Sequence, residues 1–497
     1  MKKRISLFLI LIISSIVVVK AVEAPPEGAP GANQTPTYSG ATTIETNTNK
    51  AKGNYTSNQS LQNALLVKGG TSTLNSPNIK KQGDANDESA DFYGTNAALL
   101  AINESVLTLE KANIVTNGKF ANAVFSYGTA TININNSKIT TSNNNSGGLM
   151  VAGGGKINAS NNTVATSGES SAAIRSDRGG GDITVEKGTY KTTGSGSPAI
   201  YSTAFISVED ATLESTTSEG IVIEGANSVE ISNTTLTDNN TTLHGNSETY
   251  KNIFLYQSMS VDAEEGTSSF KATNSTITTN KGDTIFVTNT SCEILLDSNT
   301  IVNKDTSGVL LRAQSGKWGN SGSNGGKVKL TLQSQEVEGD IIIDKISTLD
   351  MFVSTNSLYK GAINKDNQGK VKLSISSESN IILQGDSYVD SLDNADKNNE
   401  NIYANGHKLY VNGKAVQING NKYGSKEKKE EQKKTDYTLY YYIGAGVMAF
   451  LLLLIIIIIV SRKKKEKAKQ KQEQVVQLPM MDTTPKSMNE IYQNMKK

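Results

Sequence analysis

Four charged residues in one short segment are the strongest candidates for chemistry. Arg175, Asp177, Arg178 and Asp182 fall within eight positions, around three consecutive glycines, Gly179–Gly181. An arginine guanidinium can clamp a carboxylate through two parallel hydrogen bonds, and neighbouring carboxylates can accept protons. The segment therefore suggests a site that recognises or acts on an acidic substrate. The simpler interpretation, which we favour, is a turn held by internal salt bridges.

Other candidates for catalysis or metal binding are sparse. The two histidines, His244 and His407, have no acidic pair beside them in sequence, and we expect both to be plain loop residues. The single cysteine excludes a disulfide framework and a multi-cysteine zinc site. Asp283, Glu293 and Asp297 would suit Ca²⁺ as oxygen ligands, but oxygen ligands this scattered are typical of ordinary surface. We expect no cofactor, with Ca²⁺ as the one ion to test.

One aromatic residue suggests a binding role instead. Trp318 is the only tryptophan, and it lies in a Gly/Ser/Asn-rich loop over residues 316–326, close to Arg312. An indole in such a loop can stack on a sugar ring. It can equally cap the local core.

The elements that must position these residues come from a repeat. The first apolar residue of each copy recurs at steps of 21 to 32 residues, and between these anchors run alternating segments rich in Ile, Val and Thr. Period-two alternation indicates strands, and a repeat of this length indicates a solenoid. The anchors are Leu99, Val124, Leu149, Ile174, Ile200, Ile221, Ile253, Ile285, Val309, Ile341 and Ile363.

This pattern predicts an all-β fold, a right-handed parallel β-helix over residues 61–420. Each coil leaves its strand edges unpaired until the next coil stacks on it. The longer steps indicate loop insertions at 238–252, 258–268 and 313–326. An antiparallel sandwich array would need hairpin turns every eight to twelve residues and would not give evenly placed anchors.

The position after each anchor should point outward from the solenoid. Eight of these nine residues are apolar or aromatic, which suggests an exposed apolar groove for a ligand or partner. The alternatives are that inserted loops cover this column or that it faces inward at a corner. The column reads Leu100, Phe125, Met150, Arg175, Tyr201, Val222, Phe254, Phe286 and Leu310. With Trp318 and Arg312, three of its four aromatic members, Tyr201, Phe254 and Phe286, are our predicted ligand-binding residues.

Four blocks also resemble a family of bacterial surface proteins, the adhesin-like right-handed β-helix repeat proteins with a pectate-lyase-like fold. These blocks are Ser171-Ala-Ala-Ile-Arg-Ser-Asp-Arg-Gly-Gly-Gly181, Ser197-Pro-Ala-Ile-Tyr-Ser202, Asn252-Ile-Phe-Leu-Tyr-Gln-Ser258 and Leu311-Arg-Ala-Gln-Ser-Gly-Lys-Trp-Gly-Asn-Ser-Gly-Ser-Asn-Gly-Gly326. The similarity spans about residues 95–415.

The resemblance implies the fold but leaves the function open, because this fold carries adhesins as well as polysaccharide lyases and hydrolases. Lyases of this fold typically use clustered carboxylates with an Arg or Lys base, and galacturonases several Asp and a His. Sparse Arg and His favour an adhesin or glycan-binding protein, leaning against an enzyme. The alternative is a membrane-tethered polysaccharide lyase or glycoside hydrolase, with Arg175, Asp177, Arg178 and Asp182 as its site.

Charge excludes one class of partner. The chain carries 49 Lys+Arg and 48 Asp+Glu. Residues 1–21 hold four bases and no acid, and residues 461–497 hold ten bases and four acids. Subtraction (49 − 14 and 48 − 4) leaves 35 bases and 44 acids between them, a net charge of −9. A region this acidic is a poor binder of nucleic acid.

Two apolar segments predict a plasma-membrane location. Residues 1–21 have the positive start, apolar stretch and small residue of a secretory signal peptide. Residues 441–460 carry no charge and are long enough to span a bilayer as a helix. We therefore expect a flexible segment at 22–60, the ectodomain outside, a charged linker at 421–440 and a basic cytoplasmic tail at 461–497. The span and this long tail depart from the usual bacterial anchoring.

Modification and sorting signals are weaker. Asn-x-Ser/Thr acceptors at Asn103, Asn158, Asn233 and Asn274 are glycosylation candidates, although a chain this rich in Asn, Ser and Thr contains such triplets by composition. Tyr492-Gln493-Asn494-Met495 resembles a tyrosine-based endocytic signal, with Tyr492 and Met495 as its key residues. The expected partners are the membrane and either glycans or host or bacterial surface proteins.

Overall fold

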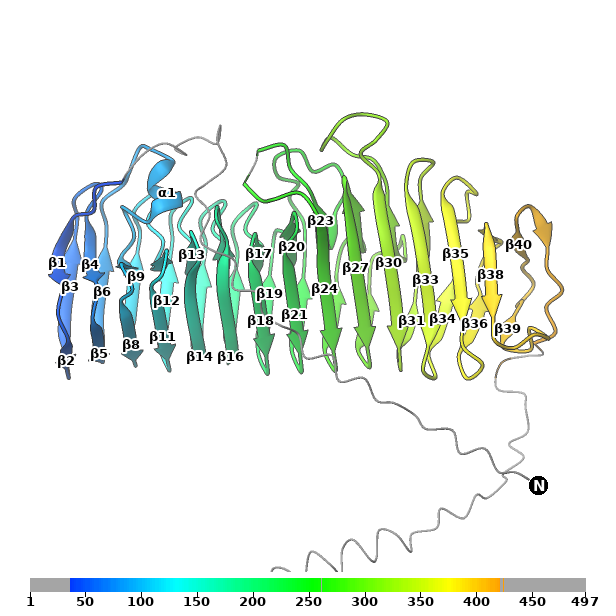
Figure 1. Cartoon of the computed structure of the whole chain (residues 1–497), viewed down its shortest axis with the longest axis horizontal. Coiled ribbons are helices and arrows are strands. Elements are labelled where there is room, and N and C mark those ends of the chain that lie inside the picture. The colour runs from blue at the N-terminus through cyan, green and yellow to red at the C-terminus, as the bar shows by residue number, and fades with distance from the viewer. Residues whose placement is uncertain (1–35, 261, 421–422, 424–497) are drawn as a thin grey trace, which may run out of the picture. The chain divides into compact units, whose positions relative to one another are not determined.

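A computed structural model describes residues 36–260, 262–420 and 423. The described part is a parallel β-solenoid with a single short helix, α1 (Ser89–Tyr93) (Figure 1). In it no helix is long and apolar enough to cross a membrane. The predicted signal peptide, transmembrane segment, linker and tail lie outside the described residues, apart from Tyr423.

Sheet A is the face that carries the anchors. It has 12 strands, each from a successive coil, paired in parallel. The strands are β1 (Gly40–Ile44), β4 (Asn63–Lys68), β7 (Leu99–Ile102), β10 (Val124–Tyr127), β13 (Leu149–Ala152), β15 (Ile174–Ser176), β17 (Ile200–Ser202), β20 (Ile221–Glu224), β23 (Lys251–Tyr256), β26 (Asp283–Thr288), β29 (Val309–Ala313) and β32 (Asp340–Ile343).

Sheet B forms the broad second face, with 22 strands, most coils giving two that are joined by a tight turn. Its strands are β2 (Thr48–Lys50), β3 (Gly53–Ser57), β5 (Thr71–Asn75), β6 (Pro77–Lys81), β8 (Val106–Glu110), β9 (Asn113–Thr116), β11 (Thr131–Asn135), β12 (Lys138–Thr141), β14 (Gly155–Thr166), β16 (Gly181–Thr192), β18 (Phe205–Glu209), β19 (Thr212–Ser215), β21 (Ser228–Ser232), β22 (Thr235–Asp238), β24 (Thr267–Thr273), β25 (Thr276–Thr279), β27 (Thr290–Asp297), β28 (Thr300–Asn303), β30 (Gly326–Gln333), β33 (Thr348–Ser354), β35 (Lys370–Ile375) and β38 (Ser391–Asn394).

Two small sheets complete the C-terminal coils. Sheet C contains β31 (Glu336–Glu338), β34 (Leu358–Gly361), β36 (Asn380–Leu383) and β39 (Ile402–Tyr403). Sheet D contains β37 (Ser387–Val389), β40 (Leu409–Val411) and β41 (Lys414–Ala415). The pair β40–β41 is antiparallel.

Inward-facing Ile, Leu and Val side chains stack into one continuous core along the solenoid. Leu99, Val124, Leu149 and Ile174 are direct register partners on successive strands, and all four are fully buried. This confirms the repeat and its inward column. Parallel stacking of identical positions explains why a residue-level period was visible in the sequence.

The turn between the two sheet B strands of a coil explains the abundance of Asn. Asn136, Asn161, Asn233 and Asn274 adopt φ values of 48 to 53°, a left-handed conformation that Asn tolerates better than most residues. The next residue donates its N–H to a buried side chain one coil further on, as Ser137 does to Asn162 Oδ1 at 2.8 Å. Ser275 donates likewise to Asn299 Oδ1 at 2.9 Å. Asn therefore shapes this turn and closes its hydrogen bonds.

One boundary and one anchor differ from our expectations. The solenoid begins at Gly40, so strands β1 to β3 lie inside the segment 22–60 that we expected to be flexible. The sequence there is rich in Thr, Asn and Gly, and its pairing with the second coil, as in Thr42 with Leu65, decides its structure. In β29 a bulge between Val309 and Leu311 makes Leu311 the partner of Ile285, so the anchor is Leu311 and Val309 was wrong.

Candidate functional site

The predicted insertions flank the sheet A strand β23 and follow β29. Together with α1, which was not predicted, these loops stand above the row of strands (Figure 1). Beneath them the outward column of sheet A is mostly buried, with Leu100, Phe125 and Met150 fully so. The expected exposed groove is therefore wrong along this column, and inserted loops cover it. Leu310 is corrected as well, since the bulge turns it into the core and gives its place to Arg312.

The covered column forms two separate apolar clusters. We call the first the N-terminal cluster: Leu66, Ala97, Leu100, Ile102, Phe125, Met150 and Ala152, with Tyr38 and Tyr127 against it. We call the second the central aromatic cluster: Val222, Phe254, Tyr256 and Phe286, with Tyr201 and Trp318 against it.

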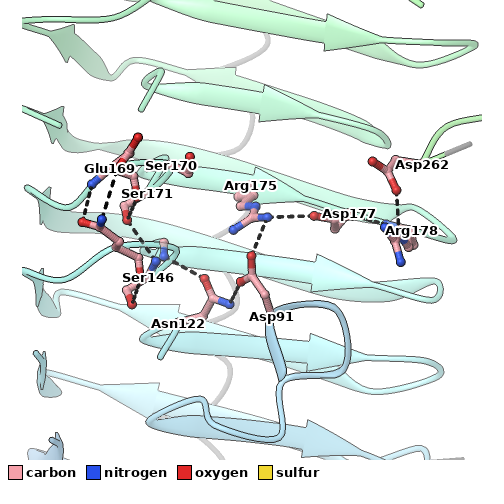
Figure 2. A network of polar contacts seen from close by, with 12 residues as sticks. Asp91, Asn122, Ser146, Glu169, Ser170, Ser171, Arg175, Asp177, Arg178 and Asp262 are labelled. Atoms are coloured by element: carbon pink, nitrogen blue, oxygen red, sulfur yellow. Dashed lines mark hydrogen bonds and ion pairs between the residues drawn. The ribbon is translucent and has the colours of Figure 1, made fainter. Parts of the chain in front are cut away.

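Between the clusters, Arg175 is held by two carboxylates (Figure 2). Its Nη2 lies 2.8 Å from Asp91 Oδ2 and 2.8 Å from Asp177 Oδ2. Asn122 donates to the other oxygen of Asp91 at 2.7 Å, which fixes that carboxylate in turn. The Nη1 of Arg175 is buried with no hydrogen-bond partner among the described residues.

The burial of this group decides what it can do. The side chains of Arg175, Asp91 and Asp177 are 12%, 5% and 6% exposed. Burial raises the pKa of Asp177 to about 6, although the charge of Arg175 opposes that rise. The geometry matches an internal salt bridge that fastens α1 to sheet A.

Arg178 fastens a second loop. Its Nε lies 2.6 Å from Asp262 Oδ1, and its guanidinium lies over the ring of Phe92, 3.5 Å from the centroid. Asp262 is in the loop after β23, and Phe92 is in α1. Two arginines of one coil therefore connect sheet A to loops that lie far before and far after it in sequence.

Asp182 is not part of this cluster, which corrects our four-residue prediction. It lies at the start of β16 on sheet B and pairs with Lys156 at 2.9 Å, with both side chains about half exposed. The glycine-rich turn at 179–181 separates it from Arg178 and moves the chain to another face.

The predicted ligand-binding aromatics come together in the central aromatic cluster. Phe254 and Tyr256 stack with centroids 4.5 Å apart and planes at 9°, and Trp318 lies 4.8 Å from Tyr256 at 56°. Phe286 lies 5.8 Å from Phe254. Trp318 and Tyr201 remain partly exposed at its margins.

A small pocket opens beside Trp318. Its walls come from the loop before β23 and from the loop after β29, with Phe254 and Phe286 on the sheet side. It has room for about one water molecule in its present shape. Lys317 and Glu248, one from each loop, form an ion pair at 3.1 Å. The pocket is therefore framed by two insertions that an ion pair connects.

Lys251 lies under this pocket and was not predicted. Its ammonium is 3.2 Å from Glu219 Oε1, bonds Ser247 Oγ at 2.8 Å and sits 4.3 Å from the centre of the Phe254 ring. It is almost fully buried. A desolvated cation on an aromatic face stabilises both the ring and the loop that holds it.

Arg312, predicted to support Trp318, is instead paired with Asp283. Its Nε and Nη2 lie 2.6 and 3.2 Å from the two carboxylate oxygens, which makes the pair bidentate. Arg312 is the register partner of Phe286 on the neighbouring strand. Burial raises the pKa of Asp283, and Arg312 opposes this. Arg312 thus borders the central aromatic cluster while its guanidinium is occupied.

Tyr201 belongs to a further hydrogen-bonded group at the edge of the cluster. Tyr201 and Tyr256 both donate to Glu224 Oε2, the latter at 2.8 Å. Burial, followed by the charge of Glu224, raises the pKa of both phenols well above the ordinary value. Both tyrosines therefore stay protonated donors.

The remaining candidates are spread over the surface. Asp283, Glu293 and Asp297 do not converge, since Glu293 pairs with Lys329 and Asp297 with Ser298. Within the described ranges no group of three or more His, Cys, Asp or Glu residues is arranged to hold a metal. The glycosylation candidates Asn103, Asn158, Asn233 and Asn274 are all exposed, whereas Tyr492 and Met495 lie outside the described residues.

Sequence reasoning missed Asp91, Asp262, Glu224 and Lys251. The first two lie in insertions, where no periodic pattern links a residue to its partner. Glu224 and Lys251 are polar residues at the ends of apolar runs. That position is the one sequence signal that could have identified them.

The comparisons with known proteins bear on the fold. Residues 122–321 match the family model described as a right-handed β-helix region. No curated protein and no solved structure matches the chain. The match and the parallel solenoid together define a right-handed parallel β-helix.

Proposed function

We propose that this chain is a single-pass surface protein whose β-helix displays a glycan-binding site, in the manner of an adhesin. The observation that carries the proposal is the Trp318 pocket. A partly exposed indole stands on Tyr256 between two insertion loops, with polar side chains around it. Sugar rings bind in such places, with an apolar face on an aromatic ring and hydroxyls on nearby polar groups.

The display part of the proposal rests on the ends of the sequence. The signal-like segment 1–21 and the apolar segment 441–460 favour export and anchoring in the plasma membrane. A rigid solenoid between them would hold its loops away from the bilayer. Glycans are the partners we favour, with host or bacterial surface proteins as the alternative.

The enzymatic alternative has one observation in its favour. Arg175 does lie beside two carboxylates, as a polysaccharide lyase or glycoside hydrolase of this fold would require. The group is, however, covered by α1 and has both carboxylates on one guanidinium nitrogen. Substrate would have to displace α1 to reach it, so binding without turnover is the better proposal.

The test uses the purified full chain in detergent on immobilised polysaccharides and mucins, with and without Ca²⁺. Retained protein and released oligosaccharide are measured in the same wells. We expect retention without product, and an apparent affinity about fivefold weaker for Trp318→Ala, because losing the aromatic face should remove about 1 kcal/mol of binding free energy. Tyr388→Ala is the matched control, because Tyr388 is a partly buried aromatic stacked 4.8 Å from Tyr410 on sheet D.

Three outcomes would contradict the proposal. Equal retention of both variants would place the binding site elsewhere. Soluble product in the wild-type wells would establish the enzymatic alternative. Absence of retention on every glycan would leave a protein partner.

A further inference from the structure

His244 is held in a defined place by the loop between β22 and β23. The N–H groups of Thr241 and Thr242 both donate to Thr217 O, at 3.2 and 3.1 Å, so the loop bends back over earlier coils. The imidazole then lies against Gly196, where an added Cβ would be 2.5 Å from the ring. The expectation that His244 is a plain loop residue misses this contact.

Each ring nitrogen of His244 faces a side chain with a role in acyl-transfer chemistry. Nε2 lies 3.4 Å from the hydroxyl of Ser170, and Nδ1 lies 3.6 Å from Glu169 Oε1. The histidine is 74 residues from Ser170 in sequence, so the folded loop alone brings them together. Hydroxyl, imidazole and carboxylate stand in the order that activates a serine.

The carboxylate is itself oriented, as that role needs. Asn144, one coil earlier, donates to Glu169 Oε2 at 3.1 Å and accepts from the N–H of Glu169 at 3.1 Å. Because Asn144 binds Oε2, the other carboxylate oxygen of Glu169, Oε1, is the one that faces the imidazole. Figure 2 shows Glu169 beside Ser170.

Ser170 lies in a turn that repeats from coil to coil, and it is partly exposed. Its φ of 52° matches those of Asn145 and Phe120, 53° and 54°, at the same turn of the two preceding coils. His244 is 37% exposed and Glu169 half exposed, so a substrate can reach the group from solvent. In this respect it differs from the buried Arg175 group.

The geometry points to a second function, a serine ester-cleaving site in which Ser170 is the nucleophile, His244 the general base and Glu169 its positioning residue. The substrate class is a carboxylic ester. The inference uses different residues from the glycan-binding proposal and does not depend on it.

The reaction balances without a cofactor. As Ser170 Oγ bonds to the ester carbonyl carbon, its proton passes to His244 Nε2. The bond from that carbon to the alkoxy oxygen then breaks, and the leaving alcohol takes the proton from Nε2. Water attacks the acyl-serine with the same nitrogen as base, releasing the carboxylic acid and restoring the hydroxyl.

The surrounding hydrogen bonds predict slow turnover. The N–H of Ser170 donates to Ser195 O at 3.0 Å, and that of Ser171 donates to Ser197 Oγ at 2.8 Å. Neither is free to stabilise an oxyanion, and one such donor is worth roughly 10²- to 10³-fold in rate. The covalent adduct is therefore a more sensitive readout than product release.

The experiment treats the full chain with a fluorophosphonate probe and locates the adduct by peptide mass spectrometry. We expect modification of Ser170 that falls at least tenfold in His244→Gln and disappears in Ser170→Ala. Ser195→Ala is the matched control and keeps wild-type labelling, because only its main-chain oxygen bonds the site. Unlabelled Ser170 in the wild type, or labelling unchanged in His244→Gln, would overturn the inference.

A glycine pair tests the contact that places His244. Gly196→Ala introduces a Cβ against the ring at a φ of 59°, and we expect labelling to fall at least threefold. Gly128→Ala carries the same kind of backbone strain, at a φ of 66°, with nothing within 4 Å of the added atom. Equal labelling in the two variants would show that the position of His244 does not matter, and with it the proposed base would be lost.

Discussion

The N-terminal cluster and the central aromatic cluster occupy the same outward column of sheet A but differ in how they are covered. In the first, α1 and its flanking residues cover Leu100, Phe125 and Met150 completely. In the second, two long insertions cover Phe254 and Phe286 yet leave Trp318 and Tyr201 partly exposed around a pocket. The N-terminal cluster is therefore a second core, whereas the central aromatic cluster is open to solvent at the pocket.

The difference shows that the segments packed over sheet A, and not the outward column of sheet A itself, determine which part of this face can bind a ligand. An apolar position outside the solenoid is compatible with either outcome. Over the N-terminal cluster the covering residues are apolar, such as Ala97 and Tyr38, and they leave Leu100, Phe125 and Met150 with no exposed surface. The insertions over the central aromatic cluster are longer and carry charged residues. Lys317 of one insertion and Glu248 of the other form an ion pair. Substitutions in the two clusters should therefore have opposite effects on stability and binding.

Phe125→Ala in the N-terminal cluster is one of the two substitutions, with Arg175→Ala, for which we expect the largest effect. Phe125 is fully buried, and an added Cβ on Gly94 would lie 2.8 Å from its ring, so there is little freedom to fill the space left. We expect the free energy of unfolding to fall by about 3–5 kcal/mol. Urea unfolding followed by circular dichroism measures it.

Trp318→Ala is the comparison for that experiment. It should lower the free energy of unfolding by about 1 kcal/mol, because the indole is partly exposed and its aromatic contact is with the ring of Tyr256. Similar losses in both variants would mean that the central aromatic cluster is a core as closed as the first, and the binding proposal would lose its basis.

The fold was predictable because stacking repeats one position many times. Leu99, Val124, Leu149 and Ile174 could be placed in register from spacing alone, and the structure confirms them. The one error in that series, Val309 for Leu311, comes from a bulge that adds a residue without changing the apolar pattern. Periodicity averages over coils and does not detect a single irregular one.

The site was predictable only where it lies on strands. Phe254, Phe286 and Tyr201 could be grouped from the repeat, and they do cluster. Asp91 and Asp262 could not be joined to Arg175 and Arg178. Each lies more than eighty positions away, in α1 and in the loop after β23, where no periodic pattern links a residue to its partner. Asp182 was grouped by nearness in sequence, although the turn after Arg178 leads to another sheet.

Arg175 and Asp182 give the second comparison, between a buried and an exposed ion pair. Arg175→Ala leaves Asp91 and Asp177 buried without their shared cation, and we expect a loss of about 3–5 kcal/mol in the free energy of unfolding. Asp182→Ala removes an exposed pair with Lys156 and should cost less than about 1 kcal/mol. Urea unfolding of both variants decides it, and a small effect of Arg175→Ala would show that α1 is not fastened by this residue.

The last prediction is a pH dependence of stability that comes from Asp177. Burial raises the pKa of Asp177 from 3.8 to about 6, so between these values the folded protein binds a proton that the unfolded chain has released. The stability contributed by this group is therefore fully present below about pH 4 and is lost as the pH rises to about 6. The loss is at most about 1.4 kcal/mol per pH unit in that window. Asp177→Asn, which cannot titrate, should remove it.

The measurement is the difference in the free energy of unfolding between wild type and Asp177→Asn from pH 4 to pH 7. Taking the difference cancels carboxylates with the opposite behaviour, such as Glu219, whose pKa lies below its ordinary value because Lys251 and nearby donors outweigh its burial. We expect Asp177→Asn to gain on the wild type as the pH rises to 6, with no further change above it. A difference independent of pH would mean that Arg175 holds Asp177 ionised throughout. The contribution of the Arg175 ion pairs to the free energy of unfolding would then be the same at every pH in this range.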